Sequence, residues 1–153
     1  MNAVAPLFTS NEVLIDVDAP NRQALFESVG RLWEARHGLV VAEVVESLNA
    51  REKLGSTGLG QGVAIPHARV KGLGQAVGAF VRPKLPIEFD SPDGQPVSYF
   101  FVLLVPAHAT EQHLQILADV AAMLSNAQFR EQLGAAQNRE EIHRLFAGEG
   151  SAS

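Results

Sequence analysis

The chain has 153 residues, a formal net charge of −5 and no cysteine. This length suits one domain with a sizeable core, and the lack of cysteine excludes disulfides, thiolate metal sites and cysteine nucleophiles. The acidic balance argues against nucleic acid as the main partner, since that role favours a basic surface.

The amino-terminal stretch lacks the basic start of a signal peptide. No apolar run approaches the roughly 18 residues that a membrane-spanning helix needs. We therefore expect a cytoplasmic protein without membrane insertion.

Strands and helices are predicted to alternate along the chain after a loose lead-in over residues 1–10, in which only Leu7 and Phe8 are expected to make a short contact. Alternating or continuous apolar runs predict strands over residues 13–17, 63–66, 76–81 and 97–105. Apolar residues at helical spacing predict helices over residues 21–37, 40–53, 110–125, 126–134 and 138–146. Asp18 is the expected N-cap of the first helix and Gly38 its expected end.

The strand over 97–105 is apolar on both faces toward its end, which predicts a central strand covered on both sides. Interleaved strands and helices indicate an α/β fold. We expect a single domain over residues 1–153, with a mixed sheet flanked by helices on both faces. Residues 148–153 are expected to be a disordered tail.

Residues 51–71 concentrate the side chains that carry chemistry. They include four basic residues and one acidic residue, and four glycines fall within the eight positions 55–62. From Lys53 to Ile87 there is no Asp or Glu, which we interpret as keeping carboxylates away from a bound anion. The backbone N–H groups of such a loop can contact an anion, although a flexible connector is the alternative.

The glycine loop lacks the Gly-Lys-Ser/Thr ending of a P-loop and the dinucleotide-binding fingerprint, which argues against nucleotide binding. There is also no Gly-x-Ser-x-Gly elbow of a serine hydrolase.

Two histidines are candidates for chemistry. His67 follows Pro66, and the proline stiffens the end of the predicted strand, which suits a side chain that attacks along a defined line. His113 falls in the first turn of a helix if Thr110 caps it, where the helix N-terminus favours anions and disfavours a charged imidazole. The alternatives are a His67 without a role, or a metal site formed by both histidines, for which a third ligand is missing.

The sequence from Arg51 to His67, REKLGSTGLGQGVAIPH, closely resembles the signature of a known family. It is the enzyme IIA domain of the bacterial phosphoenolpyruvate-dependent phosphotransferase system, fructose/mannitol class. The later segments PIEFD, FVLLVP and QHL match in the same order, so the resemblance covers nearly the whole chain. The chain looks most similar to the nitrogen-regulatory type, which implies the mannitol-type enzyme IIA fold.

The resemblance implies a role for each matching residue. His67 would accept a phosphoryl group from a histidine phosphocarrier protein, with Nε2 as the attacking atom. Arg51 and His113 would support it, and we predict that both lie within hydrogen-bonding distance of a phosphoryl group on His67. The expected phosphoryl-binding loop residues are Ser56, Thr57 and Gly58. No metal or other cofactor is implied.

The chain departs from the family at Ala68-Arg69, where Gly-Lys is common, so the charge is kept and backbone freedom is reduced.

Three functions remain open. The resemblance favours a phosphotransferase with a phosphohistidine intermediate that acts as a regulator and binds target proteins by phosphorylation state. The expected absence of fused sugar-specific IIB or IIC parts supports this reading. The second function is sugar transport, with phosphate passed to a separate fructose- or mannitol-type IIB protein. The third is an interaction module without transfer, which the presence of Arg51, His67 and His113 disfavours.

Overall fold

The computed structural model describes residues 4–108 and 110–148. In chain order the elements are the 3-10 turns η1 (Ala5–Leu7) and η2 (Ser10–Glu12), then β1 (Val13–Val17), α1 (Arg22–His37), α2 (Val41–Lys53), β2 (Gly58–Gly60), β3 (Val63–Ala64), β4 (His67–Val70), β5 (Val77–Pro83), β6 (Tyr99–Pro106), α3 (Glu111–Ser125), α4 (Ala127–Ala135) and α5 (Arg139–Phe146).

Strand β6 lies at the centre of the six-stranded sheet that the described residues form. It pairs antiparallel with β5 on one side and parallel with both β3 and β4 on the other. The path of the sheet runs β1-β5-β6-β3-β2, and β4 also pairs with β6. Residues 100–105 are all buried, so the prediction of a central strand from this apolar run is confirmed.

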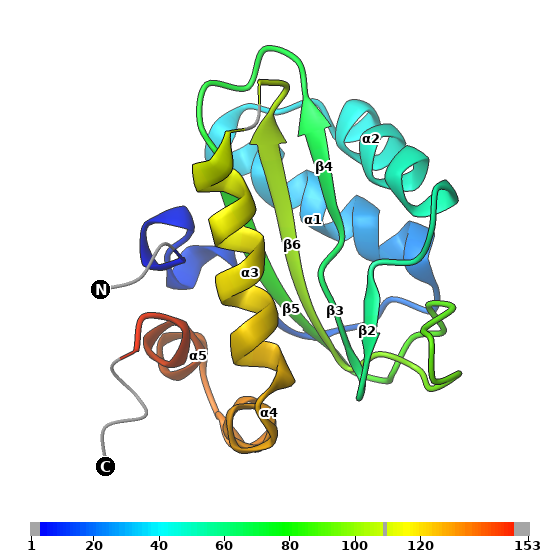
Figure 1. The fold of residues 1–153 in the computed structure, drawn as a ribbon, viewed down its shortest axis with the longest axis vertical. Coiled ribbons are helices and arrows are strands. Elements are labelled where there is room, and N and C mark those ends of the chain that lie inside the picture. The colour runs from blue at the N-terminus through cyan, green and yellow to red at the C-terminus, as the bar shows by residue number, and fades with distance from the viewer. Residues whose placement is uncertain (1–3, 109, 149–153) are drawn as a thin grey trace.

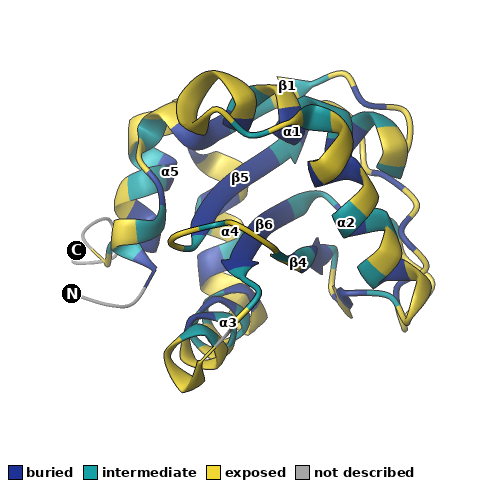
Figure 2. Cartoon of the chain, turned by 90° about the horizontal axis from the view of Figure 1, so that it is seen from above, coloured by how far each residue is buried: buried dark blue, intermediate teal, exposed yellow. Residues whose placement is uncertain are grey.

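Helices cover both faces of the sheet (Figures 1 and 2). Helices α1 and α2 pack on one face, and α3, α4 and α5 pack on the other, so the described residues form two hydrophobic cores. Successive residues of β6 alternate between them: Phe100, Val102 and Leu104 belong to the first core, and Phe101, Leu103 and Val105 belong to the second. The predicted α/β fold with a mixed sheet between helices is confirmed.

The first helix begins later than its predicted cap. Asn21, not Asp18, is the N-cap of α1, and its Oδ1 accepts from the Ala24 N–H at 2.9 Å. Pro20 favours an extended Ala19, which keeps the helix from starting earlier. The other end is as predicted, because Gly38 takes the left-handed conformation with φ 69°.

The strand predicted over 63–66 ends before the proline, and a second strand begins directly after it. The first is β3, which ends at Ala64, and the second is β4, which begins at His67. Both strands pair with β6, and the Leu103 N–H donates to the Pro66 carbonyl at 2.9 Å between them. Pro66 has no N–H to donate, but its carbonyl still accepts a hydrogen bond from β6. Pairing with β6 therefore resumes at His67. The predicted loop 55–62 also contains β2, which pairs antiparallel with β3.

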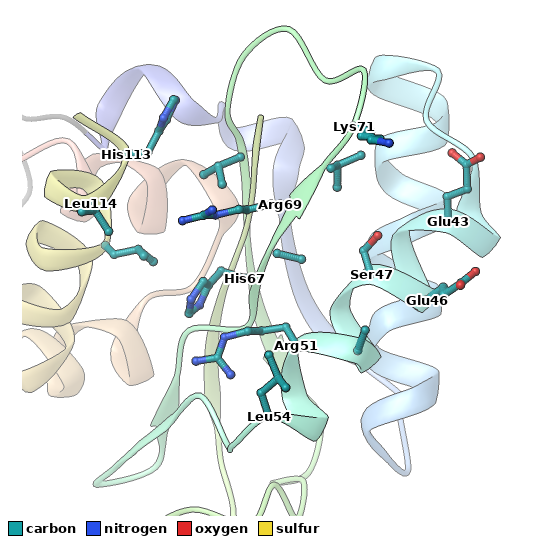
Figure 3. Close-up of a pocket in the computed structure, with 15 residues that line it drawn as sticks. Glu43, Glu46, Ser47, Arg51, Leu54, His67, Arg69, Lys71, His113 and Leu114 are labelled. Atoms are coloured by element: carbon teal, nitrogen blue, oxygen red, sulfur yellow. The ribbon is translucent and has the colours of Figure 1, made fainter. Parts of the chain in front are cut away.

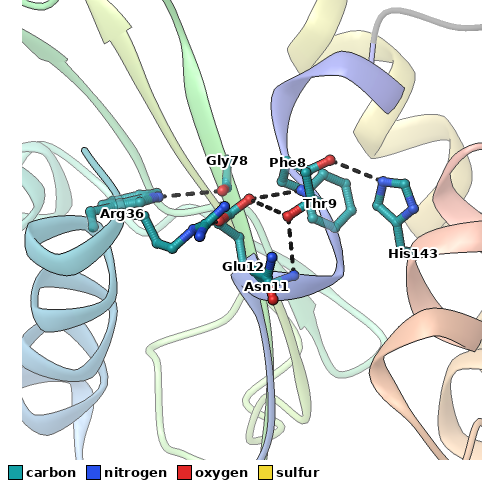
Figure 4. Close-up of polar contacts among 8 residues, drawn as sticks. Phe8, Thr9, Asn11, Glu12, Arg36, Gly78 and His143 are labelled. Carbon is teal, nitrogen blue, oxygen red and sulfur yellow. Dashed lines mark hydrogen bonds and ion pairs between the residues drawn. The ribbon is translucent and has the colours of Figure 1, made fainter.

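The lead-in predicted to be loose is packed from Val4 onward. Phe8 is 4% exposed, and its ring centroid lies 5.4 Å from that of Phe101. Its carbonyl lies 2.9 Å from His143 Nε2 (Figure 4). Buried Glu12 accepts from the Thr9 N–H and forms an ion pair with Arg36 of α1 (Figure 4). Residues 1–3 lie outside the described part of the chain, as does the predicted tail beyond Gly148.

Across residues 4–108 and 110–148, no helix is both long enough and apolar enough to pass through a membrane.

Candidate functional site

A pocket of about 760 Å³ opens between α2, β4 and the start of α3 (Figure 3). Its lining brings Arg51, His67 and His113 together from these three elements. Among the described strands, β4 pairs only with β6. Helix α2 packs on one face of the sheet and α3 on the other, and residues of both helices line the pocket beside β4.

Arg51 lies in the last turn of α2, where a cation complements the partial negative charge of the helix end. Its Nη1 donates to the carbonyl of Gly55 at 2.8 Å. This bond holds the guanidinium against the loop that follows the helix. Figure 3 shows the Arg51 side chain beside the imidazole of His67.

His67 is the first residue of β4 and is half-buried. Its Nδ1 lies 2.8 Å from the carbonyl oxygen of Ile65. A carbonyl oxygen only accepts, so Nδ1 carries the hydrogen and Nε2 keeps a free lone pair. The ring therefore presents Nε2 as the nucleophilic atom, which the sequence alone could not decide.

The pKa of His67 lies below its ordinary value. Burial is the main cause, because it penalises the charged ring. The bond to the Ile65 carbonyl raises the pKa, the positive charge of Arg51 lowers it, and the carboxylate of Glu52 raises it. The net lowering keeps the imidazole neutral at neutral pH and its Nε2 lone pair available.

His113 lies in the first turn of α3, whose N-cap is Thr110 as predicted. Its Nδ1 accepts from the Thr110 N–H at 3.0 Å. In the neutral ring the hydrogen is then on Nε2, which makes this atom a donor. His67 and His113 thus have opposite tautomers, one suited to attack and the other to hydrogen-bond an anion.

The three expected loop residues do not line this pocket. The Ser56 hydroxyl donates to the Phe89 carbonyl at 2.8 Å and accepts from the Gly58 N–H at 3.0 Å. The Thr57 hydroxyl donates to the carboxylate of Glu52, and the Thr57 N–H donates to the same carboxylate at 3.2 Å. Their polar groups hold the loop together.

Glu52 is the residue that sequence reasoning missed. It lies beside Arg51 in α2 and is only 6% exposed. The one available signal was an acid flanked by the basic residues Arg51 and Lys53 just before the glycine loop.

The interpretation that carboxylates are kept away from the site is correct only for the sequence after Lys53. Helix α2 brings Glu43 and Glu46 into the pocket lining, which also contains the basic Arg69 and Lys71. Within the described ranges, no three His, Asp or Glu side chains cluster in a way that would hold a metal ion.

The sequence and the fold both match a known family. Residues 6–148 match the family described as phosphoenolpyruvate-dependent sugar phosphotransferase system, EIIA 2. The chain therefore belongs to this family of phosphotransferase-system proteins.

Its curated relatives include nitrogen regulatory proteins. That of Pseudomonas aeruginosa is 39% identical over 140 residues, which are 91% of each chain. That of Escherichia coli is 39% identical over 131 residues, 85% of this chain and 80% of the relative. The predicted resemblance to the nitrogen-regulatory type is confirmed.

Solved structures of related proteins have the same fold. Nitrogen regulatory protein IIA-Ntr from Neisseria meningitidis superimposes with a TM-score of 0.89 at 45% identity, covering 94% of this chain and 98% of that one. The mannitol IIA protein of Escherichia coli has a TM-score of 0.75 at 19% identity, covering 91% and 98%. This second match shows the mannitol-type fold alone.

Proposed function

We propose that this protein is a regulatory phosphoryl-relay protein in which Nε2 of His67 accepts a phosphoryl group from a histidine phosphocarrier protein. The observation that carries the proposal is the bond from His67 Nδ1 to the Ile65 carbonyl. It leaves Nε2 unprotonated on a neutral ring, in a pocket that Arg51 and His113 also line.

In the transfer step, the Nε2 lone pair attacks the phosphorus atom as the N–P bond to the donor imidazole breaks. The donor nitrogen takes the electrons of that bond. Phosphoryl transition states are loose, so positioning and charge stabilisation do most of the work. Positive charge develops on the His67 ring because Nδ1 keeps its hydrogen. The Ile65 carbonyl, which accepts from Nδ1, stabilises that charge.

Arg51 and His113 act on the oxygens of the phosphoryl group. The planar guanidinium of Arg51 can donate to two oxygens at once. His113 donates from Nε2, since its Nδ1 is occupied by the Thr110 N–H. The loop residues Ser56, Thr57 and Gly58 contribute to the site by fixing the shape of the loop. Their hydrogen bonds are made to one another, to Glu52 and to Phe89.

The relatives named as nitrogen regulatory proteins favour regulation, in which target proteins distinguish the phosphorylated from the free form. Transfer to a separate fructose- or mannitol-type IIB protein is the alternative, and it has less support. A phosphohistidine is labile, which suits a reversible signal.

The test is intact-protein mass spectrometry after incubation with enzyme I, a histidine phosphocarrier protein and phosphoenolpyruvate. We expect the gain of one acid-labile phosphoryl group, absent in His67→Ala. His37→Ala, which removes an exposed histidine at the end of α1, is the matched control and should still gain the group. No gain by the wild type from a competent donor would overturn the proposal.

A further inference from the structure

Glu52 is a buried carboxylate that the transfer step does not use. Burying a carboxylate is unfavourable unless its oxygens are hydrogen-bonded. Both oxygens are satisfied by one residue, Thr57: Oε1 accepts from its hydroxyl and Oε2 accepts from its N–H at 3.2 Å. The carboxylate thus fixes Thr57 through its side chain and its backbone together.

A chain of hydrogen bonds continues from Thr57 to His67. The Thr57 carbonyl accepts from the Ile65 N–H at 3.1 Å. The Ile65 carbonyl then accepts from Nδ1 of His67 at 2.8 Å. A continuous series of hydrogen bonds therefore joins Glu52 of α2 to His67 of β4 through Thr57 and Ile65.

This chain supports the point where the sheet is interrupted. Ile65 and Pro66 lie between β3 and β4, outside both strands. On the Thr57 side, the Ile65 N–H is held by the Thr57 carbonyl. If Thr57 moved, the Ile65 carbonyl would lose its alignment with Nδ1 of His67. Among residues 4–108 and 110–148, no other group hydrogen-bonds that nitrogen.

Resting on the proposed function of His67, we propose that Glu52 is a positioning residue that acts through Thr57 and Ile65. It holds the imidazole as the tautomer with hydrogen on Nδ1 and so keeps Nε2 free to attack. Glu52 does not touch the phosphoryl group in this scheme.

The negative charge of Glu52 adds a second readout. Its carboxylate raises the pKa of His67 and so opposes the larger effects of burial and Arg51. The other charged or titratable groups that line the pocket with His67 are Arg51, Glu43 and Glu46 from α2, Arg69 and Lys71 from β4 and the residue after it, and His113 from α3. Replacing Glu52 alone leaves all of these in place.

The experiment is nitrogen-15 NMR of the His67 ring in the unphosphorylated protein as a function of pH. In Glu52→Gln we expect a mixture of tautomers and a lower titration midpoint, because an amide keeps the volume but loses the charge and one acceptor. The rate constant for phosphoryl transfer at saturating donor should fall about tenfold, since small misplacements of a reacting group are costly. The donor concentration for half-maximal rate should stay unchanged.

Matched variants distinguish a specific effect on the His67 ring from a general effect of removing a carboxylate or a hydroxyl. Glu34→Gln removes an exposed carboxylate on α1 and should leave the ring unchanged. Thr57→Val replaces the hydroxyl that donates to Glu52 with a methyl group and should reproduce the tautomer change, even if Glu52→Gln does not fold. Thr57→Ser keeps the hydroxyl and should restore the wild-type ring.

The inference and the proposed function fail in different ways. If His67 keeps its wild-type tautomer in folded Glu52→Gln or in Thr57→Val, Glu52 is not a positioning residue, whether or not the midpoint moves. The proposed function would stand in that case. If the wild type accepts no phosphoryl group, the function fails, and the ring measurement still decides the role of Glu52.

Discussion

His67 and His113 share one pocket but meet opposite partners at Nδ1. A carbonyl accepts from the first and a backbone N–H donates to the second. Local backbone geometry therefore fixes the tautomer of each ring, which suits His67 to the proposed role of nucleophile and His113 to the proposed role of donor. Side-chain identity alone would leave both tautomers open in both rings.

At the residue scale, the first prediction concerns His113. We expect His113→Ala to slow phosphoryl transfer to His67 by about 10²-fold, because the developing charge loses one fixed donor. His113→Gln, whose amide can still donate, should retain more of the rate. These rates are measured by quenching the reaction at successive times and determining the phosphorylated fraction by mass spectrometry. Equal rates in His113→Ala and wild type would exclude a role for this ring.

The second prediction concerns pH. The pKa of folded His67 lies below its ordinary value of 6.5, so on acidification the unfolded chain takes up this proton first. The contribution of His67 to stability is complete above 6.5 and is lost as the pH falls from 6.5 through the lower folded pKa.

Urea unfolding of wild type and His67→Gln at about pH 8 and about pH 5 measures this contribution. The wild type should lose more stability on acidification than the variant does. Equal losses would contradict the lowered pKa.

Three residues of the candidate site were predictable, because Arg51 and His67 lie within one continuous motif and His113 follows a helix start signal. Glu52 was not predictable. An acidic residue between two basic ones on a helix usually faces water, and only the fold shows that this one is buried against Thr57.

At the element scale, the glycine loop is closely packed where β2 begins. A Cβ on Gly58 would lie 2.5 Å from Ser91 Oγ and 3.2 Å from Ser91 Cα. Ser91 is buried, so it has little room to move away. The sequence showed a flexible-looking run of glycines, and only the neighbouring segment reveals why one of them must be small.

The third prediction follows. We expect Gly58→Ala to lower the free energy of unfolding by about 1–3 kcal/mol, as overpacking typically does. Gly74→Ala, at a position with nothing within 4 Å of the added carbon, is the control and should be near neutral. Chemical denaturation measures both. If Gly58→Ala were as stable as Gly74→Ala, the segment around Ser91 would have to shift and accommodate the added carbon.

Element boundaries differ from their sequence predictions for local reasons. Asp18 and Asn21 are both good N-caps, and Pro20 between them decides in favour of the later one. Pro66 is typical of a strand end, and β3 does end just before it, yet parallel pairing with β6 resumes at His67 as β4. Tertiary pairing of this kind has no signature in a short stretch of sequence.

At the scale of the whole molecule, the amino-terminal segment joins both helix layers. Phe8 packs against Phe101 of β6 and Phe146 of α5, while Glu12 is bonded to Arg36 of α1 (Figure 4). The α/β class was predictable, because a central apolar strand needs cover on both faces. The packing of the lead-in was not, since its short apolar groups show no period.

The fourth prediction tests that packing. We expect Phe8→Ala to lower the free energy of unfolding by about 3–5 kcal/mol, because it leaves a cavity among three aromatic rings. Phe8→Leu should cost less. Thermal and urea unfolding measure the change. A loss within about 0.5 kcal/mol, as at an exposed site, would mean that the lead-in is dispensable.

We propose above that the fold selects Nε2 of His67 as the phosphoryl acceptor. Nitrogen-15 and phosphorus-31 NMR of the phosphorylated protein tests it most directly, because coupling to phosphorus identifies the bonded ring nitrogen. We predict that phosphorus is bonded to Nε2 of His67, with the hydrogen retained on Nδ1. Phosphorus on Nδ1, or on any residue other than His67, would rule out Nε2 of His67 as the acceptor.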